Sequence, residues 1–382
     1  MRSLESCYRD RDNTLGFLRL VFASMVVLTH AWPASGHGQD PLSRLTEGRW
    51  NIGTIGLIGF FVMSGFLITQ SAQRLSIPRY AWHRVLRIFP AFLVCIVFTA
   101  FVLAPALWLY EYHGISGFFS HPAGPVDYVT KNARLGIQQW GVSGLPINTP
   151  ENKVAGGPIF DAPLWTLQYE FLLYGAVAAL AVVGLKRRAA WMLPPLLLGT
   201  WLYTEVIAHS GRTVNDSFYG PMPVLGGWIN LVYVGGLALM FVIGATMAAH
   251  AKRVPVSDTL ALACAVTCAV SVVLDGPQFL NFATLGYVVL WGGVRLPLPR
   301  RVFGMHRDYS YGIYIYAFLF QQALTEIGVR NFAVHLAATF ALTVPLAMLS
   351  WHFIEKRALS LKGIKVGRRT APVPADAPTA SP

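Results

Sequence analysis

The sequence predicts an all-α membrane protein, a polytopic bundle of about ten transmembrane helices with both termini in the cytoplasm. The chain has 382 residues, of which 54% are hydrophobic and only 13% are charged, whereas soluble domains average about a quarter charged residues. Ten apolar runs are close to the length that crosses a bilayer as a helix. They are residues 14–32, 52–71, 89–109, 164–184, 190–208, 229–250, 257–274, 279–294, 309–327 and 332–353.

The distribution of Lys and Arg gives these spans an orientation, because the cytoplasmic loops of membrane proteins carry an excess of both residues. With the N-terminus inside, 22 of the 30 Lys and Arg residues fall in cytoplasmic segments and 7 in outer segments. The net charge of +12 is therefore expected to face membrane lipid, and no nucleic-acid partner is expected.

The chain is expected to form one membrane domain, residues 1–358, followed by a cytoplasmic tail, residues 359–382. The tail is basic at first and then rich in Pro and Ala, so we expect it to be disordered. The longest interruption between spans, about residues 110–163, lies outside and could cover a cleft on the outer face. The four cysteines show no metal-site pattern, and no metal is expected.

Two ionisable residues, Arg19 and His30, lie inside the first span, where such side chains usually mark a functional site. They are eleven residues apart, which is about three helical turns, so both lie on one helix face, about 16 Å apart along its axis. An extended pantetheine arm has a comparable reach, so this face could hold both ends of a carried acyl group. A snorkelling Arg19 and an interfacial His30 are the structural alternative.

Glu170 lies near the outer end of the fourth span, and we expect it to share the depth of His30. A carboxylate beside an imidazole fixes its tautomer and stabilises the imidazolium that forms when it takes up a proton. Tyr174 follows one turn later and could hydrogen-bond to Glu170. In the alternative interpretation, Glu170 is the structural partner of an arginine in a loop.

A second polar cluster precedes the third span. Arg84 and Arg87 are three residues apart, and His83 is four residues from Arg87, so all three could point the same way from a helix. Clustered arginines bind phosphates through bidentate hydrogen bonds. Anchoring to anionic lipid would explain the same charges, and the spacing does not decide between the two.

Four motifs resemble those of the acyltransferase-3 family of bacterial membrane O-acyltransferases. Arg19 and His30 match the Arg-x10-His of its first span. Its motifs Phe-Phe-x-x-Ser-Gly-Phe-Leu-Ile, Arg-x-x-Arg-Ile-x-Pro and Trp-Ser-Leu-x-x-Glu-x-x-Phe-Tyr match the stretches Phe60–Ile68, Arg84–Pro90 and Trp165–Tyr174.

The resemblance covers about residues 12–358, with some departures. Thr166 replaces the usual Ser and Leu173 the usual Phe, and a stretch of the ninth span that often ends in His ends here in Ala317. We therefore assign no catalytic role to the ninth span. The chain ends soon after the tenth span and is expected to lack the fused esterase-like domain of some relatives. An acceptor is thus expected to meet the membrane domain directly or through a separate extracytoplasmic partner protein.

The resemblance implies transfer of an acyl group, most often acetyl, from cytoplasmic acetyl-CoA to a hydroxyl group of a cell-surface or lipid-linked saccharide at the bacterial inner membrane. The CoA phosphates would bind Arg84 and Arg87, and the pantetheine would pass Arg19 toward His30. His30 would act as general base or briefly carry the acyl group, and Glu170 would orient it.

Two other functions stay open. The acceptor could be a small molecule such as a macrolide. A permease or flippase for a saccharide is the alternative from another class, although the sequence shows neither an internal repeat nor the paired Gly and Pro interruptions typical of many transporters.

Overall fold

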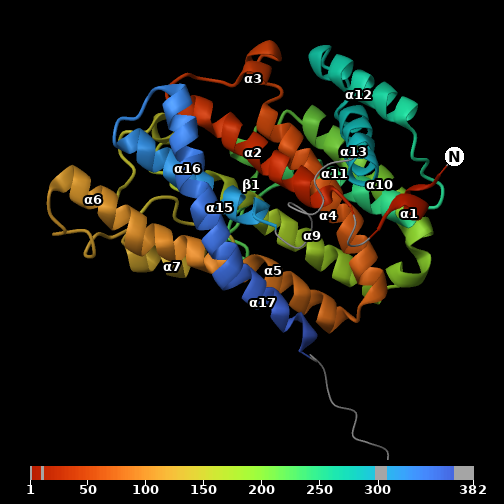
Figure 1. Cartoon of the computed structure of the whole chain (residues 1–382), viewed down its shortest axis with the longest axis horizontal. Coiled ribbons are helices and arrows are strands. Elements are labelled where there is room, and N and C mark those ends of the chain that lie inside the picture. The colour runs from red at the N-terminus through yellow and green to blue at the C-terminus, as the bar shows by residue number, and fades with distance from the viewer. Residues whose placement is uncertain (1, 10–12, 297–307, 365–382) are drawn as a thin grey trace, which may run out of the picture.

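A computed structural model describes residues 2–9, 13–296 and 308–364 (Figure 1). A helix lies over every one of the ten apolar segments predicted above. In chain order the long helices are α2 (Leu15–Ala34), α4 (Ile52–Arg74), α5 (Ile77–Phe98), α9 (Trp165–Val182), α10 (Leu185–His209), α11 (Leu231–Ala249), α12 (Asp258–Val273), α13 (Gln278–Arg295), α15 (Ser310–Glu326) and α16 (Phe332–Ser350).

Shorter elements connect these helices. They are α1 (Leu4–Cys7), α3 (Pro41–Leu45), η1 (Thr99–Leu103), α6 (Ala104–Tyr112), α7 (Pro125–Asn132), α8 (Pro150–Ala155), η2 (Ala162–Leu164), η3 (Asn215–Ser217), η4 (Trp351–Glu355), α17 (Lys356–Ser360) and η5 (Leu361–Gly363). Two short strands, β1 (Phe218–Tyr219) and β2 (Ile229–Asn230), pair antiparallel.

Length and composition support a multi-pass helical membrane protein. Among the described residues, six helical stretches are long and apolar enough to cross a membrane: Leu15–Ala34, Ile52–Arg74, Ile77–Tyr112, Ala162–Val182, Leu231–Ala249 and Phe332–Gly363. The other four predicted segments fall on α10, α12, α13 and α15, of which α12 and α15 have only 16 and 17 residues. The count of ten spans and the placement of both termini in the cytoplasm stay predictions.

The third predicted span, residues 89–109, is part of a much longer helical rod. The Arg-rich segment before it is helical as well, and α5 continues through the π-helical turn η1 into α6, so that the helix runs over 36 residues from Ile77 to Tyr112. It follows the lower edge of the view in Figure 1. Pro78 near the start of α5 and a left-handed His113 after α6 mark its two ends.

Segments expected on the same side of the membrane contact one another. At one end of the bundle, the Leu4 amide donates to the Val254 carbonyl at 2.8 Å. At the opposite end, the Gly53 amide donates to Thr29 Oγ1 at 2.6 Å. Following the predicted orientation, we call the first the inner end and the second the outer end.

The first residues of the predicted tail, residues 359–382, are helical. Residues 359–363 belong to α17 and η5, and Trp82 Nε1 donates a hydrogen bond to the Leu361 carbonyl at 3.1 Å. This contact holds the segment against the inner end of α5. Residues 365–382, the Pro- and Ala-rich part of the prediction, lie outside the described residues.

The centre of the bundle is formed by α4, which packs against both α2 and α11 (Figure 1). Two glycines allow α4 and α11 to touch backbone to backbone. A Cβ on Gly65 would lie 1.9 Å from the Phe241 carbonyl oxygen, and one on Gly244 would lie 2.0 Å from the Val62 carbonyl oxygen. Small residues at such crossings let transmembrane helices approach closely.

Gly244→Ala should therefore destabilise the protein, because the added methyl group meets main-chain atoms that cannot rotate away. We expect a loss of about 1–3 kcal/mol, measured as a lower unfolding midpoint of the detergent-solubilised protein. Gly236→Ala is the matched control, since it lies in the same helix and its Cβ would meet nothing within 4 Å. Equal midpoints for the two variants would contradict the close α4–α11 contact.

Candidate functional site

His30 borders a pocket of about 750 Å³ at the outer end of the bundle. The imidazole meets the Phe318 ring of α15 edge to face, with 5.0 Å between the ring centroids. Asp40 and Glu151 are the two carboxylates among the residues that line this pocket. A histidine, two carboxylates and an aromatic ring thus converge on one cavity, a set that can move protons and bind hydroxyl groups.

One wall of the outer pocket is fixed by Asp40. This residue is the N-cap of α3 and is followed by a proline, a combination that starts helices. Its Oδ1 accepts the Leu42 and Ser43 amides at 3.0 and 3.1 Å, and its Oδ2 accepts Thr29 Oγ1 at 3.0 Å. Asp40 therefore ties the loop after α2 to the helix turn that carries His30.

A second pocket, of about 770 Å³, is lined by all three arginines predicted to bind the acyl donor: Arg19, Arg84 and Arg87. Arg19 comes from α2, and the other two come from the first turns of α5. Ser64 and Tyr174 are also part of its wall. The structure thus brings the three predicted arginines together, on the opposite part of α2 from His30.

A carboxylate that the sequence analysis missed holds two of these arginines. Asp308 Oδ2 lies 2.9 Å from Arg19 Nη1 and 2.6 Å from Arg87 Nη2, and the three side chains are only 8%, 23% and 13% exposed. Burial alone would raise the pKa of Asp308, but the charges of Arg19 and Arg87 lower it to about 2. Asp308 is therefore ionised at neutral pH, and its negative charge compensates the positive charges of Arg19 on α2 and Arg87 on α5.

The two arginines of α5, Arg84 and Arg87, differ in how far their hydrogen-bonding groups and charge are already engaged. Arg87 also approaches Glu355, with 3.5 Å between Nη1 and Oε2, so two carboxylates meet its charge. Arg84 instead lies over the rings of Tyr80 and Tyr174, at 5.8 and 5.7 Å from their centroids. Its buried Nε has no hydrogen-bond partner among the described residues. Of the two, Arg84 is better placed to bind an added anion.

Glu170 lies at a different depth from the one expected. Its Oε1 accepts hydrogen bonds from Ser64 Oγ at 2.8 Å and from the Tyr174 hydroxyl. Both donors line the inner pocket. Ser64 follows Gly53 by eleven residues in α4, so it lies about 16 Å further inward than the contact between Gly53 and Thr29. The described contacts thus place Glu170 near the depth of Arg19 rather than that of His30.

Glu170 lies deeper than expected because α9, the helix that carries it, begins inside the bundle. Thr166, in its first turn, hydrogen-bonds to the Tyr314 hydroxyl with 2.5 Å between the oxygens. Tyr314 is only four residues from the start of α15, which enters the bundle from the inner end. Depth counted from the edge of the apolar run therefore placed Glu170 too far out.

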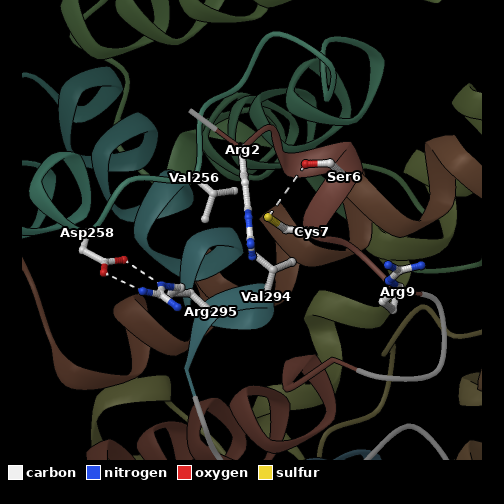
Figure 2. Close-up of a pocket in the computed structure, with 8 residues that line it drawn as sticks. All are labelled: Arg2, Ser6, Cys7, Arg9, Val256, Asp258, Val294 and Arg295. Carbon is white, nitrogen blue, oxygen red and sulfur yellow. Dashed lines mark hydrogen bonds and ion pairs between the residues drawn. The ribbon is translucent and has the colours of Figure 1, made fainter.

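A third pocket, of about 900 Å³, lies at the inner end, between α1, the start of α12 and the end of α13 (Figure 2). Arg2 and Arg9 line it together with Arg295, which is paired with Asp258 at 3.0 Å. Among the described residues, its lining contains no histidine, and the one carboxylate there, Asp258, is already paired with Arg295. We therefore place no chemistry there. Across the described residues, no group of three His, Cys, Asp or Glu side chains could hold a metal ion.

Sequence reasoning missed three carboxylates: Asp40, Glu151 and Asp308. A signal existed for Asp40, because Asp-Pro at the start of a helix marks an N-cap. Asp308 is the first residue before the ninth apolar run and the only acidic one in the predicted cytoplasmic segment 295–308, which could have marked it as a partner for an arginine. Glu151 follows a proline in a long loop and carried no such signal.

The chain is similar to known proteins over most of its length. A family model described as an acyltransferase domain matches residues 12–352. An O-acetyl transferase of Shigella phage Sf6 is 29% identical over 367 residues, covering 93% of this chain and 98% of that protein. Nodulation protein 10 of Rhizobium leguminosarum bv. viciae is 28% identical over 375 residues, covering 94% and 96%. No solved structure matches the chain.

Asp308→Asn should destabilise the protein, because it leaves two buried guanidinium groups without their shared counter-charge. Removing one partner of a buried ion pair costs about 3–5 kcal/mol, which would appear as a lower unfolding midpoint in detergent. Asp258→Asn is the matched control, since it breaks an Asp–Arg pair of similar length whose side chains are 60% and 59% exposed. An Asp308→Asn midpoint no lower than that of the control would show that the buried bridge is dispensable.

Proposed function

The chain belongs to the acyltransferase-3 family, and on that premise we propose that it transfers an acetyl group from acetyl-CoA to a hydroxyl group of a cell-surface or lipid-linked saccharide. The family and the relative named as an O-acetyl transferase establish a multi-pass membrane O-acyltransferase. The donor, the acceptor and the bacterial inner membrane are our proposals. The observation that carries them is the pair of pockets at the two ends of the α2 face bearing Arg19 and His30.

In this proposal the inner pocket takes the acyl donor. Arg84 would bind a CoA phosphate, because its buried Nε has no partner and its planar guanidinium suits an anionic oxygen. Arg87, whose charge Asp308 and Glu355 compensate, would form part of the pocket wall more than bind a phosphate itself. Arg19 would guide the pantetheine arm at the start of its path along α2, and the arm has about 16 Å to cover to reach His30.

The outer pocket would take the acceptor, with His30 as the catalytic residue. As the acceptor oxygen attacks the thioester carbonyl, its proton passes to the imidazole, the carbon–sulfur bond breaks, and the departing CoA thiolate takes up the proton. In a second route the imidazole nitrogen attacks first, the carbon–sulfur bond breaks, and the departing CoA thiolate takes up the proton that the acylated imidazole releases. The acceptor oxygen then attacks the acetyl carbonyl, the bond from carbon to imidazole nitrogen breaks, and the freed imidazole takes the proton of the acceptor hydroxyl. Both routes give the acetyl ester and CoA, and both require His30.

The predicted role of Glu170 changes in this proposal. Its contacts with Ser64 and Tyr174 suit a residue that positions the wall of the donor pocket. The carboxylates that share a pocket with His30 are Asp40 and Glu151. A separate extracytoplasmic partner protein remains part of the proposal, as a means of presenting a large acceptor to the outer end.

His30→Ala should abolish acetylation without unfolding the protein, because it removes the only histidine among the residues that line the outer pocket. We expect at least a 100-fold loss, in line with the roughly 10²–10⁴-fold worth of general-base catalysis. The measurement is mass spectrometry of surface glycans, before and after mild base, from cells carrying each variant. His209→Ala, with a side chain 80% exposed at the end of α10, is the control.

A base-labile acetyl group present in wild type and control but absent in His30→Ala would support the proposal. Wild-type acetylation in a well-folded His30→Ala variant would overturn it. Unchanged acetylation with altered glycan export would favour a permease or flippase. No glycan difference of either kind, together with consumption of acetyl-CoA by the purified protein, would point to a small-molecule acceptor.

Arg19→Lys should also impair the enzyme, because an ammonium group cannot reproduce the guanidinium geometry in which Nη1 meets Asp308 at 2.9 Å. We expect at least about a tenfold fall in kcat/KM for acetyl-CoA, measured with purified protein. Arg295→Lys, at the exposed pair with Asp258, is the matched control. Full activity of Arg19→Lys would mean that Arg19 contributes only positive charge or lipid anchoring.

A further inference from the structure

Two buried polar side chains beside the outer pocket are not used by the chemistry above. Both carboxylate oxygens of Glu151 are buried, and so are the amide oxygen and nitrogen of Gln322; none has a hydrogen-bond partner within the described part of the chain. Burial raises the pKa of Glu151, and its own backbone amide and the side-chain amide of Gln322 partly oppose that rise. The two side chains therefore lie close enough to interact, but no hydrogen bond of good geometry joins them.

Glu151 is held at this place by its surroundings. The Glu326 carboxylate, at the end of α15, accepts the amides of Ile147 and Asn148 at 2.8 and 2.7 Å. Arg330 Nη2 donates to the Asn148 carbonyl at 2.9 Å. These contacts fix the start of α8, which packs on α2, so that Glu151 lines the same pocket as His30.

Gln322 follows Phe318 by one turn of α15, so both side chains lie on the same face of that helix. The Gln322 side chain is fully buried and is not itself among the residues that line the pocket. The Phe318 ring lines the pocket and meets the His30 imidazole. Glu151 thus shares the pocket with His30, and Gln322 lies one helical turn from the ring that meets the imidazole.

Burying Glu151 and Gln322 without hydrogen-bond partners lowers the stability of the protein unless a ligand supplies those partners. Leaving a buried polar group without a hydrogen bond costs about 1–3 kcal/mol. An ionised carboxylate only accepts hydrogen bonds, whereas an amide both donates and accepts. A ligand that satisfies both must offer several donors and at least one acceptor within a short distance, and neighbouring hydroxyl groups on a sugar ring do so.

We propose that Glu151 and Gln322 bind hydroxyl groups of the acceptor other than the one acetylated, so that the outer pocket selects a sugar ring over an acceptor with a single hydroxyl. This inference rests on the proposed function, because it takes the outer pocket to be the acceptor site. It assigns the two residues to acceptor binding and gives them no part in donor binding.

The experiment uses the full chain in phospholipid nanodiscs, with labelled acetyl-CoA as donor. The acceptor is surface glycan purified from the source bacterium after deletion of the gene. Glu151→Gln should raise the KM for the glycan at least about tenfold, because the glycan hydroxyl groups lose their hydrogen bonds to the carboxylate. The same variant should leave the KM for acetyl-CoA unchanged. Gln322→Leu should act in the same direction. The control is Glu47→Gln, whose side chain is 84% exposed at the outer end.

A glycan KM for both Glu151→Gln and Gln322→Leu equal to that of the control would overturn the inference while leaving acetyl transfer intact. A rise in the KM for acetyl-CoA would also overturn it, because the pair would then serve the donor. If Glu151→Gln fails to fold, the KM of Gln322→Leu for the glycan alone tests the inference. If the wild type transfers no acetyl group to the glycan, the proposed saccharide acceptor is wrong and this inference falls with it.

Discussion

The inner half of this protein depends on one buried carboxylate. Asp308 bridges Arg19 of α2 and Arg87 of α5, two helices far apart in the sequence, and Glu355 adds a second negative charge beside Arg87. An isolated guanidinium group would be costly in an apolar bundle. Because Asp308 compensates the positive charges of both Arg19 and Arg87, the inner pocket can keep these arginines in its wall. Arg84 lies over tyrosine rings, and its Nε has no hydrogen-bond partner among the described residues.

The two pockets lie at opposite ends of one helix, α2. Arg19 lines the inner pocket and His30 the outer one, and buried residues of the same helix, such as Ala23 and Val27, separate them. Phe60 and Tyr314 pack together beside this stretch, with 5.9 Å between their ring centroids. In the proposed transfer, the CoA phosphates would stay at the inner end while the pantetheine arm carries the acyl group along α2 to the acceptor at the outer end.

The sequence predicted the helical bundle and much of the inner site, because both depend on local patterns. Apolar runs are long enough to show each of the ten long helices of the described residues, and helical spacing was enough to place Arg84 and Arg87 together. It misplaced Glu170, because the start of α9 is set by packing of Thr166 against Tyr314 and not by the edge of hydrophobicity. It missed Asp308 and Glu151, because each acquires its role through contacts with segments more than a hundred residues away.

The rod formed by α5, η1 and α6 is longer than the membrane is thick. Its 36 residues extend about 54 Å, against a hydrocarbon core of about 30 Å. In the predicted orientation, the basic first turns of α5 would lie in the inner headgroup layer and α6 would stand above the outer one, where Trp108 packs on Phe118 with 5.5 Å between the ring centroids. The loop after α6 would then lie in water above the membrane surface, within reach of a bulky polar molecule that does not enter the hydrocarbon of the bilayer.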